Sequence, residues 1–336
     1  MAELRDRKDI TVEELEESLG AKKLPEFIKK CESDFINGID EIVEDFLDDP
    51  NKKAVFVSGP TSSGKTTFTM RLSSGLNKRG KKAVFLSLDD YYSMRELTFD
   101  RDGRPDFETI EAIDYERAAE DIKKLINGET VIPPFFNFMT RMQEERDPSE
   151  AISIPDDGVL VVEGLHGLSQ KISGDIPDEK CTKVFIMPYG NIFCDTKLMD
   201  STEIRLLRRI VRDNRHRGAH AIATVDYWPM IAKSEEAYYT EYLTRADVHI
   251  NSLLPYESLI IAPLALEDIK KALKMVEDNC LEPNIFMARS KTGKPFADFS
   301  AALAKCSKLI KHLEKIPVID PDMVPEESIL NEFISE

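Results

Sequence analysis

One short segment of the sequence has the residue types and the spacing needed to hold a phosphate group. Residues 59–67 read GPTSSGKTT and fit the pattern GxxxxGK[ST] of a phosphate-binding loop, or P-loop. Glycines let such a loop curl, so that backbone N–H groups point inward at phosphate oxygens. The Lys65 ammonium is expected to reach the terminal phosphates of a nucleotide, and the Thr66 hydroxyl to bind Mg²⁺. The expected nucleotide-binding residues are Gly59, Thr61, Ser62, Ser63, Gly64, Lys65, Thr66 and Thr67.

Acidic residues end two of the apolar runs that follow the P-loop. Asp89 and Asp90 come after the run at 83–88, and Glu163 directly follows the run at 159–162. Carboxylates at the C-terminal ends of parallel strands lie in the crevice where such sheets bind ligands. An aspartate there can accept a proton from a substrate hydroxyl, whereas the ordinary alternative is capping of the next helix. Glu163 is expected to act near Mg²⁺, as a Walker B acid does.

A cluster of arginines occurs in a chain that is otherwise acidic. Six arginines lie between positions 205 and 217, and the spacing places Arg205, Arg208, Arg209 and Arg212 on one face of a predicted helix. A solvated surface is the ordinary interpretation of such a run. The use of arginine instead of lysine throughout favours bidentate phosphate contacts. We therefore expect a lid whose arginines close over the transferring phosphoryl group.

These groups need a scaffold, and the hydrophobic pattern predicts alternating strands and helices. Strongly apolar runs typical of buried strands lie at 54–57, 83–86, 159–162 and 184–187, with weaker strand candidates at 248–250 and 259–261. Helical periodicity is found at 35–47, 65–78, 113–127, 202–217, 266–278 and 299–314. The alternation predicts an α/β fold with a mainly parallel sheet. The expected organisation is an N-terminal helical extension at 1–48, a P-loop domain at 49–280, and a C-terminal helical extension with a tail at 281–336.

Composition limits the partners that the chain can have. Its 336 residues include 45 Lys+Arg and 62 Asp+Glu, which gives a formal net charge of −17 at pH 7. An acidic surface repels the phosphates of nucleic acid and of anionic lipid, so we expect neither partner. The five cysteines form no CxxC pair, and no apolar run reaches the about 18 residues that span a bilayer. We therefore expect a reduced, cytoplasmic protein. Whether it forms a homo-oligomer stays open, because the helix at 35–47 can pack on the sheet or form a dimer contact.

The ordered set of motifs resembles the uridine kinase and phosphoribulokinase family of P-loop kinases. The resemblance covers roughly residues 28–336 and is strongest to the kinase half of the long bacterial uridine kinase-like proteins that carry a TGS domain. It rests on GPTSSGKTTF at 59–68, SLDDYYSMRE at 87–96, DGRPDFETIEAID at 102–114, PPFFNFMTR at 133–141, VVEGLHGL at 161–168, STEIRLLRRIVRDNRHRG at 201–218 and RADVHINSLLPYE at 245–257. The tail, with SILNEF at 328–333, also resembles that lineage. The family resemblance implies a five-stranded parallel sheet flanked by helices.

By motif position, the resemblance also implies roles for single residues. It implies ATP and Mg²⁺ as cofactors at Lys65 and Thr66, and Glu163 beside the metal. Asp89 is implied as the base that activates the acceptor hydroxyl, with Asp90 the less favoured choice. The implied lid arginines that close on the phosphates are Arg209, Arg212 and Arg217.

For the acceptor, the resemblance implies a nucleoside pocket lined by aromatic side chains. Glu108 stands where an acid holds the ribose hydroxyls, and Tyr92, Phe136 and Phe138 fall at the aromatic positions. The sequence departs from well-studied uridine-cytidine kinases at three places. Ala219 replaces an arginine that follows the lid Arg-Gly, Arg141 replaces a pocket histidine, and Glu108 replaces the usual aspartate.

Three functions are consistent with these residues. The leading one is ATP-dependent phosphorylation of the 5′-hydroxyl of a uridine-like or cytidine-like nucleoside. The second is a kinase for another small polyol or a sugar phosphate, which Arg141 would favour if the substrate were anionic. The third is a nucleotide-sensing module without turnover, which the presence of both Lys65 and Asp89 disfavours.

Overall fold

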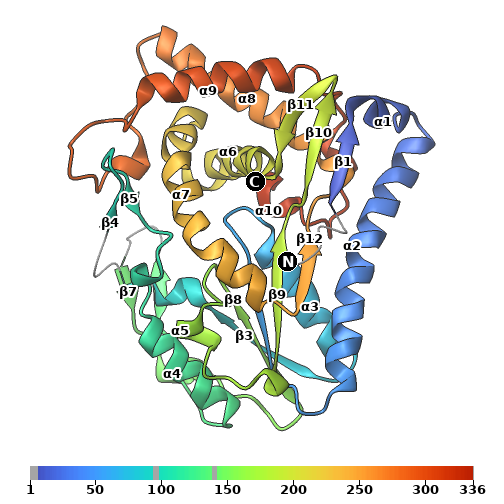
Figure 1. Cartoon of the computed structure of the whole chain (residues 1–336), viewed down its shortest axis with the longest axis vertical. Coiled ribbons are helices and arrows are strands. Elements are labelled where there is room, and N and C mark those ends of the chain that lie inside the picture. The colour runs from blue at the N-terminus through green and yellow to red at the C-terminus, as the bar shows by residue number, and fades with distance from the viewer. Residues whose placement is uncertain (1–6, 94–97, 138–141, 336) are drawn as a thin grey trace.

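A five-stranded, all-parallel sheet forms the centre of the structure. The computed structural model describes residues 7–93, 98–137 and 142–335. The strand order is β12 (Val248–Asn251), β9 (Cys181–Met187), β2 (Ala54–Ser58), β8 (Gly158–Glu163) and β3 (Lys82–Ser87). Every residue of β2 and β8 is buried, as the unbroken apolar runs predict for strands covered on both faces. The predicted α/β fold and the five strands of its sheet are confirmed (Figure 1).

Helices cover both faces of this sheet. Alternate residues of β2 point to opposite sides, so Val55 and Val57 join one core cluster while Ala54 and Phe56 join another. The first cluster includes α3 (Lys65–Lys78) and α2 (Lys23–Asp48), and the second includes α4 (Tyr115–Ile126) and α5 (Gln170–Ser173). Because the crossover helices lie on both sides, the carboxyl ends of the strands stay open at one edge of the sheet.

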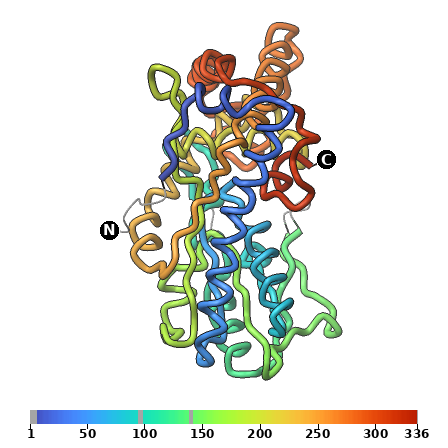
Figure 2. Tube along the Cα trace, turned by 90° about the vertical axis from the view of Figure 1, so that its right-hand side faces the viewer, coloured from blue at the N-terminus to red at the C-terminus, as the bar shows by residue number. Residues whose placement is uncertain are grey.

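The amphipathic stretch near the N-terminus forms the long helix α2, which runs along much of the molecule (Figures 1 and 2). Its buried positions Phe35, Ile39, Val43 and Phe46 form one stripe with helical spacing. The Phe35 ring contacts the Phe68 ring of α3, with centroids 6.3 Å apart. The apolar face of α2 is therefore buried by packing within the chain, which is the first of the two interpretations given for this helix, and not the dimer contact.

A second layer lies beyond the carboxyl ends of the central strands (Figure 1). Its helices are α6 (Ser201–Arg217), α7 (Ala221–Arg245), α8 (Ser258–Glu277), α9 (Phe299–Leu313) and α10 (Asn331–Ile334). The weak strand candidate at 259–261 is wrong, because these residues begin α8. Their neighbours Ala262, Ala265 and Ile269 are also buried, so a buried helix face, not a strand, explains the apolar run.

A small mixed sheet joins the N-terminal segment to this second layer. Strand β1 (Lys8–Thr11) pairs in parallel with β10 (Gly190–Cys194), which pairs antiparallel with β11 (Thr196–Asp200). The helix α1 (Val12–Glu17) follows β1 and begins with a capping box at Thr11 and Glu14. The hydrophobic pattern does not predict this sheet, because its short strands show little apolar alternation.

The remaining elements are short. Two hairpins are formed by β4 (Thr98–Phe99) with β5 (Pro105–Asp106) and by β6 (Phe135–Asn137) with β7 (Met142–Glu144). Single 3-10 turns lie at η1 (Leu88–Tyr91), η2 (Ile110–Ala112), η3 (Pro148–Glu150), η4 (Asp178–Lys180), η5 (Pro255–Glu257), η6 (Ile285–Met287) and η7 (Pro321–Met323).

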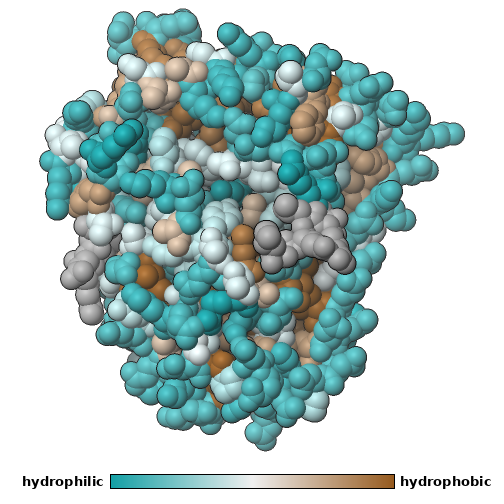
Figure 3. Space-filling view, viewed as in Figure 1, coloured by the Kyte–Doolittle hydropathy of each residue, from teal (hydrophilic) through white to brown (hydrophobic). Residues whose placement is uncertain are grey.

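One core cluster includes residues from all three expected parts of the chain, for example Phe35, Val57 and Phe333. The division at residues 48 and 280 stays a prediction. Hydrophilic residues cover most of the face in Figure 3, and hydrophobic residues appear as smaller areas between them. Within the described ranges, no helix combines the length and the apolarity that crossing a bilayer needs.

Candidate active site

The P-loop leaves β2 and turns directly into α3. Gly64, the residue before the helix, has φ +89°, and Ser62 has φ +56°. Glycine adopts this left-handed conformation without the strain that a side chain would bring. At Gly59, a Cβ atom would lie 2.1 Å from the carbonyl oxygen of Ile186, so the loop approaches β9 too closely for any other residue. The loop thus curls as a phosphate nest does.

The hydroxyl groups of the P-loop also suit an anion. The Oγ atoms of Ser62 and Ser63 are buried and have no hydrogen-bond partner within the part of the chain that the structure describes. Lys65 follows them and donates from Nζ to the carbonyl oxygen of Pro60 at 3.1 Å. Buried polar atoms normally have a partner, so unpaired hydroxyls beside a lysine fit a loop that binds phosphate oxygens. The residues present therefore fit the triphosphate of a nucleotide.

A buried ion pair holds the tip of the loop. Arg205 of α6 donates two hydrogen bonds to the Glu235 carboxylate of α7, at 2.9 and 3.0 Å. Arg205 also donates to the Thr61 carbonyl oxygen at 3.2 Å, while the Thr61 N–H donates to Glu235 at 2.8 Å. Both charged side chains are 2% exposed or less, so the pair fixes Thr61 from inside the protein.

A second buried pair fixes the next residue of the loop. Arg208 makes a two-bond contact with the Glu257 carboxylate, at 2.6 and 2.9 Å, and donates to the Ser62 carbonyl oxygen at 3.3 Å. Four arginines share a helix face as expected, but Arg205 and Arg208 are covered by protein and do not line the cavity described below. Their role is different from the lid role predicted for that face, because buried carboxylates neutralise them.

The other arginines of α6 converge on one carboxylate. Asp213, fully buried, lies 3.1 Å from Arg209, 3.7 Å from Arg212 and 3.4 Å from Arg217. Burial alone would raise the pKa of Asp213, but the three guanidinium groups lower it below its usual range. Arg209 also donates to the Thr61 hydroxyl at 2.8 Å. Asp213 therefore orders the cationic groups beside the P-loop.

These groups surround a cavity of about 550 Å³ at the open edge of the sheet. Its lining combines P-loop residues, acids, arginines and aromatic rings. The lining residues are Thr61, Ser62, Lys65, Thr66, Asp89, Tyr92, Phe107, Glu108, Phe136, Glu163, Leu165, Arg209, Arg212, His216, Arg217, Tyr227, Ile285, Phe286 and Glu332.

The two candidate bases that follow β3 have different surroundings. Asp90 forms an ion pair with Arg146 at 3.0 Å, whereas Asp89 lines the cavity together with Lys65. The Asp89 side chain is exposed within the cavity, where the surrounding protein partly desolvates it. This desolvation, reinforced by Glu108, raises the pKa of Asp89, although Lys65 opposes the shift. The geometry thus favours Asp89 as a proton acceptor.

Glu163 ends β8 and lies on the cavity floor. Burial raises its pKa to about 8, the neighbouring Lys65 acts in the opposite direction, and Asp89 adds to the rise. Thr66 lines the same cavity. No cluster of three or more His, Cys, Asp or Glu that could hold a metal ion occurs among the described residues. Mg²⁺ commonly uses one or two carboxylates together with water and substrate phosphates, so Thr66 and Glu163 fit such a site.

Aromatic side chains form one wall of the cavity. The Tyr92 ring lies 5.4 Å from the Phe136 ring, and the Tyr92 hydroxyl donates to the Phe107 carbonyl oxygen at 3.1 Å. Tyr227 of α7 stacks on Phe286 of η6 with centroids 5.0 Å apart. This wall combines elements more than 100 residues apart in the sequence.

The structure brings most of the predicted site residues to one cavity. Glu108 also lines it, and its carboxylate lies 3.8 Å from Arg209. Phe138 and Arg141 lie outside the described residues. Gly59, Ser63, Gly64 and Thr67 belong to the same loop and the first turn of α3 but do not line the cavity.

Sequence reasoning missed several residues that the site uses. Asp213 and Glu235 act through arginines, and a single acid on a helix gives no signal of such a role. Phe286 lies beyond the motifs, in the segment predicted to be a helical extension, and Glu332 lies in the tail motif at 328–333, for which no role in the site was predicted. Tyr227 carries one weak signal, its pairing with Trp228 in the helix that follows the arginine helix.

The sequence model of the Phosphoribulokinase / Uridine kinase family matches residues 55–257, which is more than half of the chain. The chain belongs to this family. A uridine kinase from Staphylococcus haemolyticus (strain JCSC1435) is 27% identical over 184 residues, covering 54% of this chain and 79% of that protein. A uridine kinase from Staphylococcus aureus (strain JH9) is 26% identical over 178 residues, covering 53% and 76%. The solved structure of a possible uridine kinase from Bacillus stearothermophilus covers 64% of this chain and 97% of its own, with 19% identity and a TM-score of 0.42.

Membership of the phosphoribulokinase/uridine kinase family makes this chain a kinase, that is, a phosphotransferase with a nucleotide-binding P-loop and a small-molecule substrate. The matched region includes the P-loop, Asp89, Glu163 and the arginines of α6. It ends at Glu257, so η6 and α10, which contribute Phe286 and Glu332 to the cavity, lie outside it.

Proposed function

We propose that the chain transfers the γ-phosphoryl group of ATP to the 5′-hydroxyl of a uridine-like or cytidine-like nucleoside. The observation that carries the proposal is the cavity, where Asp89 and Lys65 share one enclosed space with aromatic side chains. Phosphoryl transfer requires mainly positioning and charge neutralisation, and both kinds of group are present. Membership of the family and relatives that are uridine kinases support the same acceptor class.

On the donor side, the P-loop amides and the Lys65 ammonium would hold the phosphates. Arg209, Arg212 and Arg217 would neutralise the charge that develops on the transferring group. Burial and the neighbouring Arg217 lower the pKa of Arg212 to about 10, so its guanidinium still carries its charge at pH 7. Thr66 and Glu163 would hold Mg²⁺, which when bound offsets phosphate charge and orients the terminal phosphates.

On the acceptor side, Asp89 would take the proton of the attacking hydroxyl. A general base works best when its pKa approaches the operating pH, and the surroundings of Asp89 raise its pKa. Tyr92 and Phe136 offer ring faces on which a flat base can stack. Glu108 offers an acceptor for sugar hydroxyls, as its position in the family motif implies.

The experiment is an assay of ADP release with a panel of nucleosides and sugar phosphates, run with ATP and with GTP as donor. We expect uridine or cytidine to stimulate ADP release, and Lys65→Ala to reduce that stimulation by at least about 10²-fold. Absence of stimulation by every nucleoside would refute the proposed acceptor. Stimulation by a sugar phosphate alone would favour the alternative that Arg141 suggests, and nucleotide binding without any turnover would favour a sensing module.

A further inference from the structure

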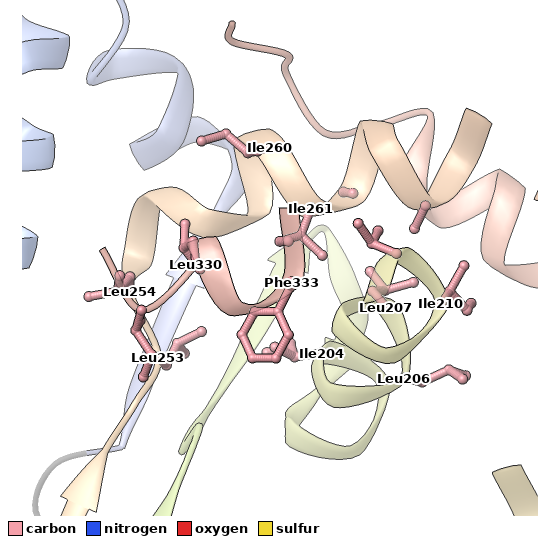
Figure 4. Close-up of a cluster of buried hydrophobic side chains, with 14 of the residues drawn as sticks. Ile204, Leu206, Leu207, Ile210, Leu253, Leu254, Ile260, Ile261, Leu330 and Phe333 are labelled. Atoms are coloured by element: carbon pink, nitrogen blue, oxygen red, sulfur yellow. The ribbon is translucent and has the colours of Figure 1, made fainter. Parts of the chain in front are cut away.

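Residues 328–334, which include α10, pack beside the P-loop as a buried segment. Ile329, Leu330 and Phe333 are all fully buried. Figure 4 shows Leu330 and Phe333 within a cluster that joins α6, α8 and the loop at Leu253 and Leu254. The Arg208 guanidinium lies 5.1 Å from the centre of the Phe333 ring. Apolar burial of this extent anchors the segment firmly against the nucleotide-binding part of the protein.

This segment contacts the P-loop itself. A Cβ atom added at Gly64 would lie 2.2 Å from Cδ1 of Ile329, so the isoleucine rests directly on the loop. One turn later, Oε2 of Glu332 lies 3.4 Å from both the backbone nitrogen and the hydroxyl of Thr67, and it accepts from both. Glu332 lines the same cavity as Lys65 and Asp89.

The position of Glu332 matters because Thr67 offers donors that a phosphate also needs. Thr67 lies in the first turn of α3, where backbone N–H groups have no partner within the helix and attract anions. In a P-loop, these amides receive the phosphates of the nucleotide. A carboxylate and a phosphate oxygen are both negative acceptors, so they compete for the Thr67 donors and repel each other.

We infer that Glu332 is an affinity-determining residue of the donor site, and that its carboxylate competes with the phosphates of the nucleotide for Thr67. The inference rests on the proposed function only in that the P-loop binds the donor. It assigns to residues 328–334 a part in the donor site, although they lie outside the region that the family model matches.

The surroundings of Glu332 allow the carboxylate to move while its segment stays in place. Its contacts with Thr67 are long, at 3.4 Å, and its side chain is half-buried, whereas Ile329 and Phe333 on either side are fully buried. A nucleotide can thus displace the Glu332 side chain without unfolding α10. The Thr67 donors then bind a phosphate oxygen in place of the Glu332 carboxylate.

The test compares Glu332→Gln with the matched control Glu327→Gln, which removes the same charge from an exposed position directly before this segment. Isothermal titration calorimetry with MgATP measures the dissociation constant directly. We expect Glu332→Gln to bind MgATP at least about tenfold more tightly than the native chain, and Glu327→Gln to bind it equally well. In the nucleoside assay, the KM for ATP should fall in parallel while kcat stays within about twofold.

Equal MgATP affinity in Glu332→Gln and the native chain would overturn the inference. Weaker binding by Glu332→Gln would also overturn it, because Glu332 would then favour nucleotide binding. A melting temperature for Glu332→Gln close to that of Glu327→Gln shows that the affinity change is not a folding effect. The calorimetry needs no acceptor, so it decides the role of Glu332 even if no nucleoside is phosphorylated. Absence of MgATP binding by every variant would instead refute both this inference and the proposed function.

Discussion

Asp213 offers the sharpest test of how the site is built, because one buried carboxylate faces three guanidinium groups. The substitution Asp213→Asn keeps the shape of the side chain and removes its charge. At 3.1 Å, and with Arg209 only 4% exposed, the Arg209 contact is the strongest of the three. Arg217, at 3.4 Å, is 41% exposed and contributes little, because water screens such pairs to about 1 kcal/mol or less.

The magnitude follows from these contacts. Two charges at such distances attract by about 5 kcal/mol at an effective dielectric constant of about 20. Part of this energy only offsets the desolvation of both groups. Breaking a buried pair by removing one partner costs about 3–5 kcal/mol, because the remaining charge stays buried without compensation. We therefore expect Asp213→Asn to lower the free energy of unfolding by about 3 kcal/mol and the melting temperature by about 4 °C.

The assay combines thermal unfolding with steady-state kinetics. A misplacement of about 1 Å at a reacting centre can cost about 10²-fold in rate, so kcat/KM for ATP should fall by at least about tenfold when the arginines are no longer held. Glu236→Gln, an exposed acid on α7, serves as the control and should change neither quantity. Native-like melting and kinetics in Asp213→Asn would refute the reasoning, since other contacts would then suffice to hold Arg209 and Arg212.

Two further predictions concern the acids of the cavity. Asp89→Asn should lower kcat by at least about 10²-fold. In the native chain, kcat/KM should begin to fall on the acid side at a pH above the usual carboxylate pKa, because the pKa of Asp89 is raised. A pH–rate profile measures this, and native-like activity in Asp89→Asn would reject its role as base. Burial raises the pKa of Glu163 to about 8 from 4.5, so the folded state binds more protons than the unfolded state between these values. The nucleotide-free protein should therefore lose stability as the pH rises from about 4.5 to 8, and Glu163→Gln should weaken that dependence in urea unfolding; an unchanged slope would contradict the assigned shift.

The central fold was predictable because its signals are local and strong. Unbroken apolar runs such as 54–57 occur where a strand is covered on both faces, and the P-loop directly follows one of them. The strands of the small sheet at β1, β10 and β11 were not predictable in the same way. The pairing of β1 with β10 depends on a contact between residues about 180 positions apart, as between Ile10 and Ile192, which no local pattern encodes.

The site was predictable where a motif fixes the chemistry, and less so where tertiary contacts decide it. Residue type and position after the strand do not separate Asp89 from Asp90, and only the family motif favours Asp89. In the structure, the ion pair of Asp90 with Arg146 separates them. The arginine helix shows the same limit. Its spacing identifies which residues share a face. It does not show that Arg205 and Arg208 form buried ion pairs, because their partners Glu235 and Glu257 lie 30 and 49 residues away in the sequence.

The burial of α6 has a consequence for the energetics of each turnover. Arg205, Arg208 and Arg209 are at most 4% exposed, enclosed by α7, α8 and α10. The free-energy cost of desolvating their guanidinium groups arises when the chain folds and does not recur each time a substrate binds. The dipoles around the phosphates are then already oriented, so little solvent reorganisation accompanies the movement of charge. The stability of the second layer, including the parts of it that do not line the cavity, thereby enters the height of the chemical barrier.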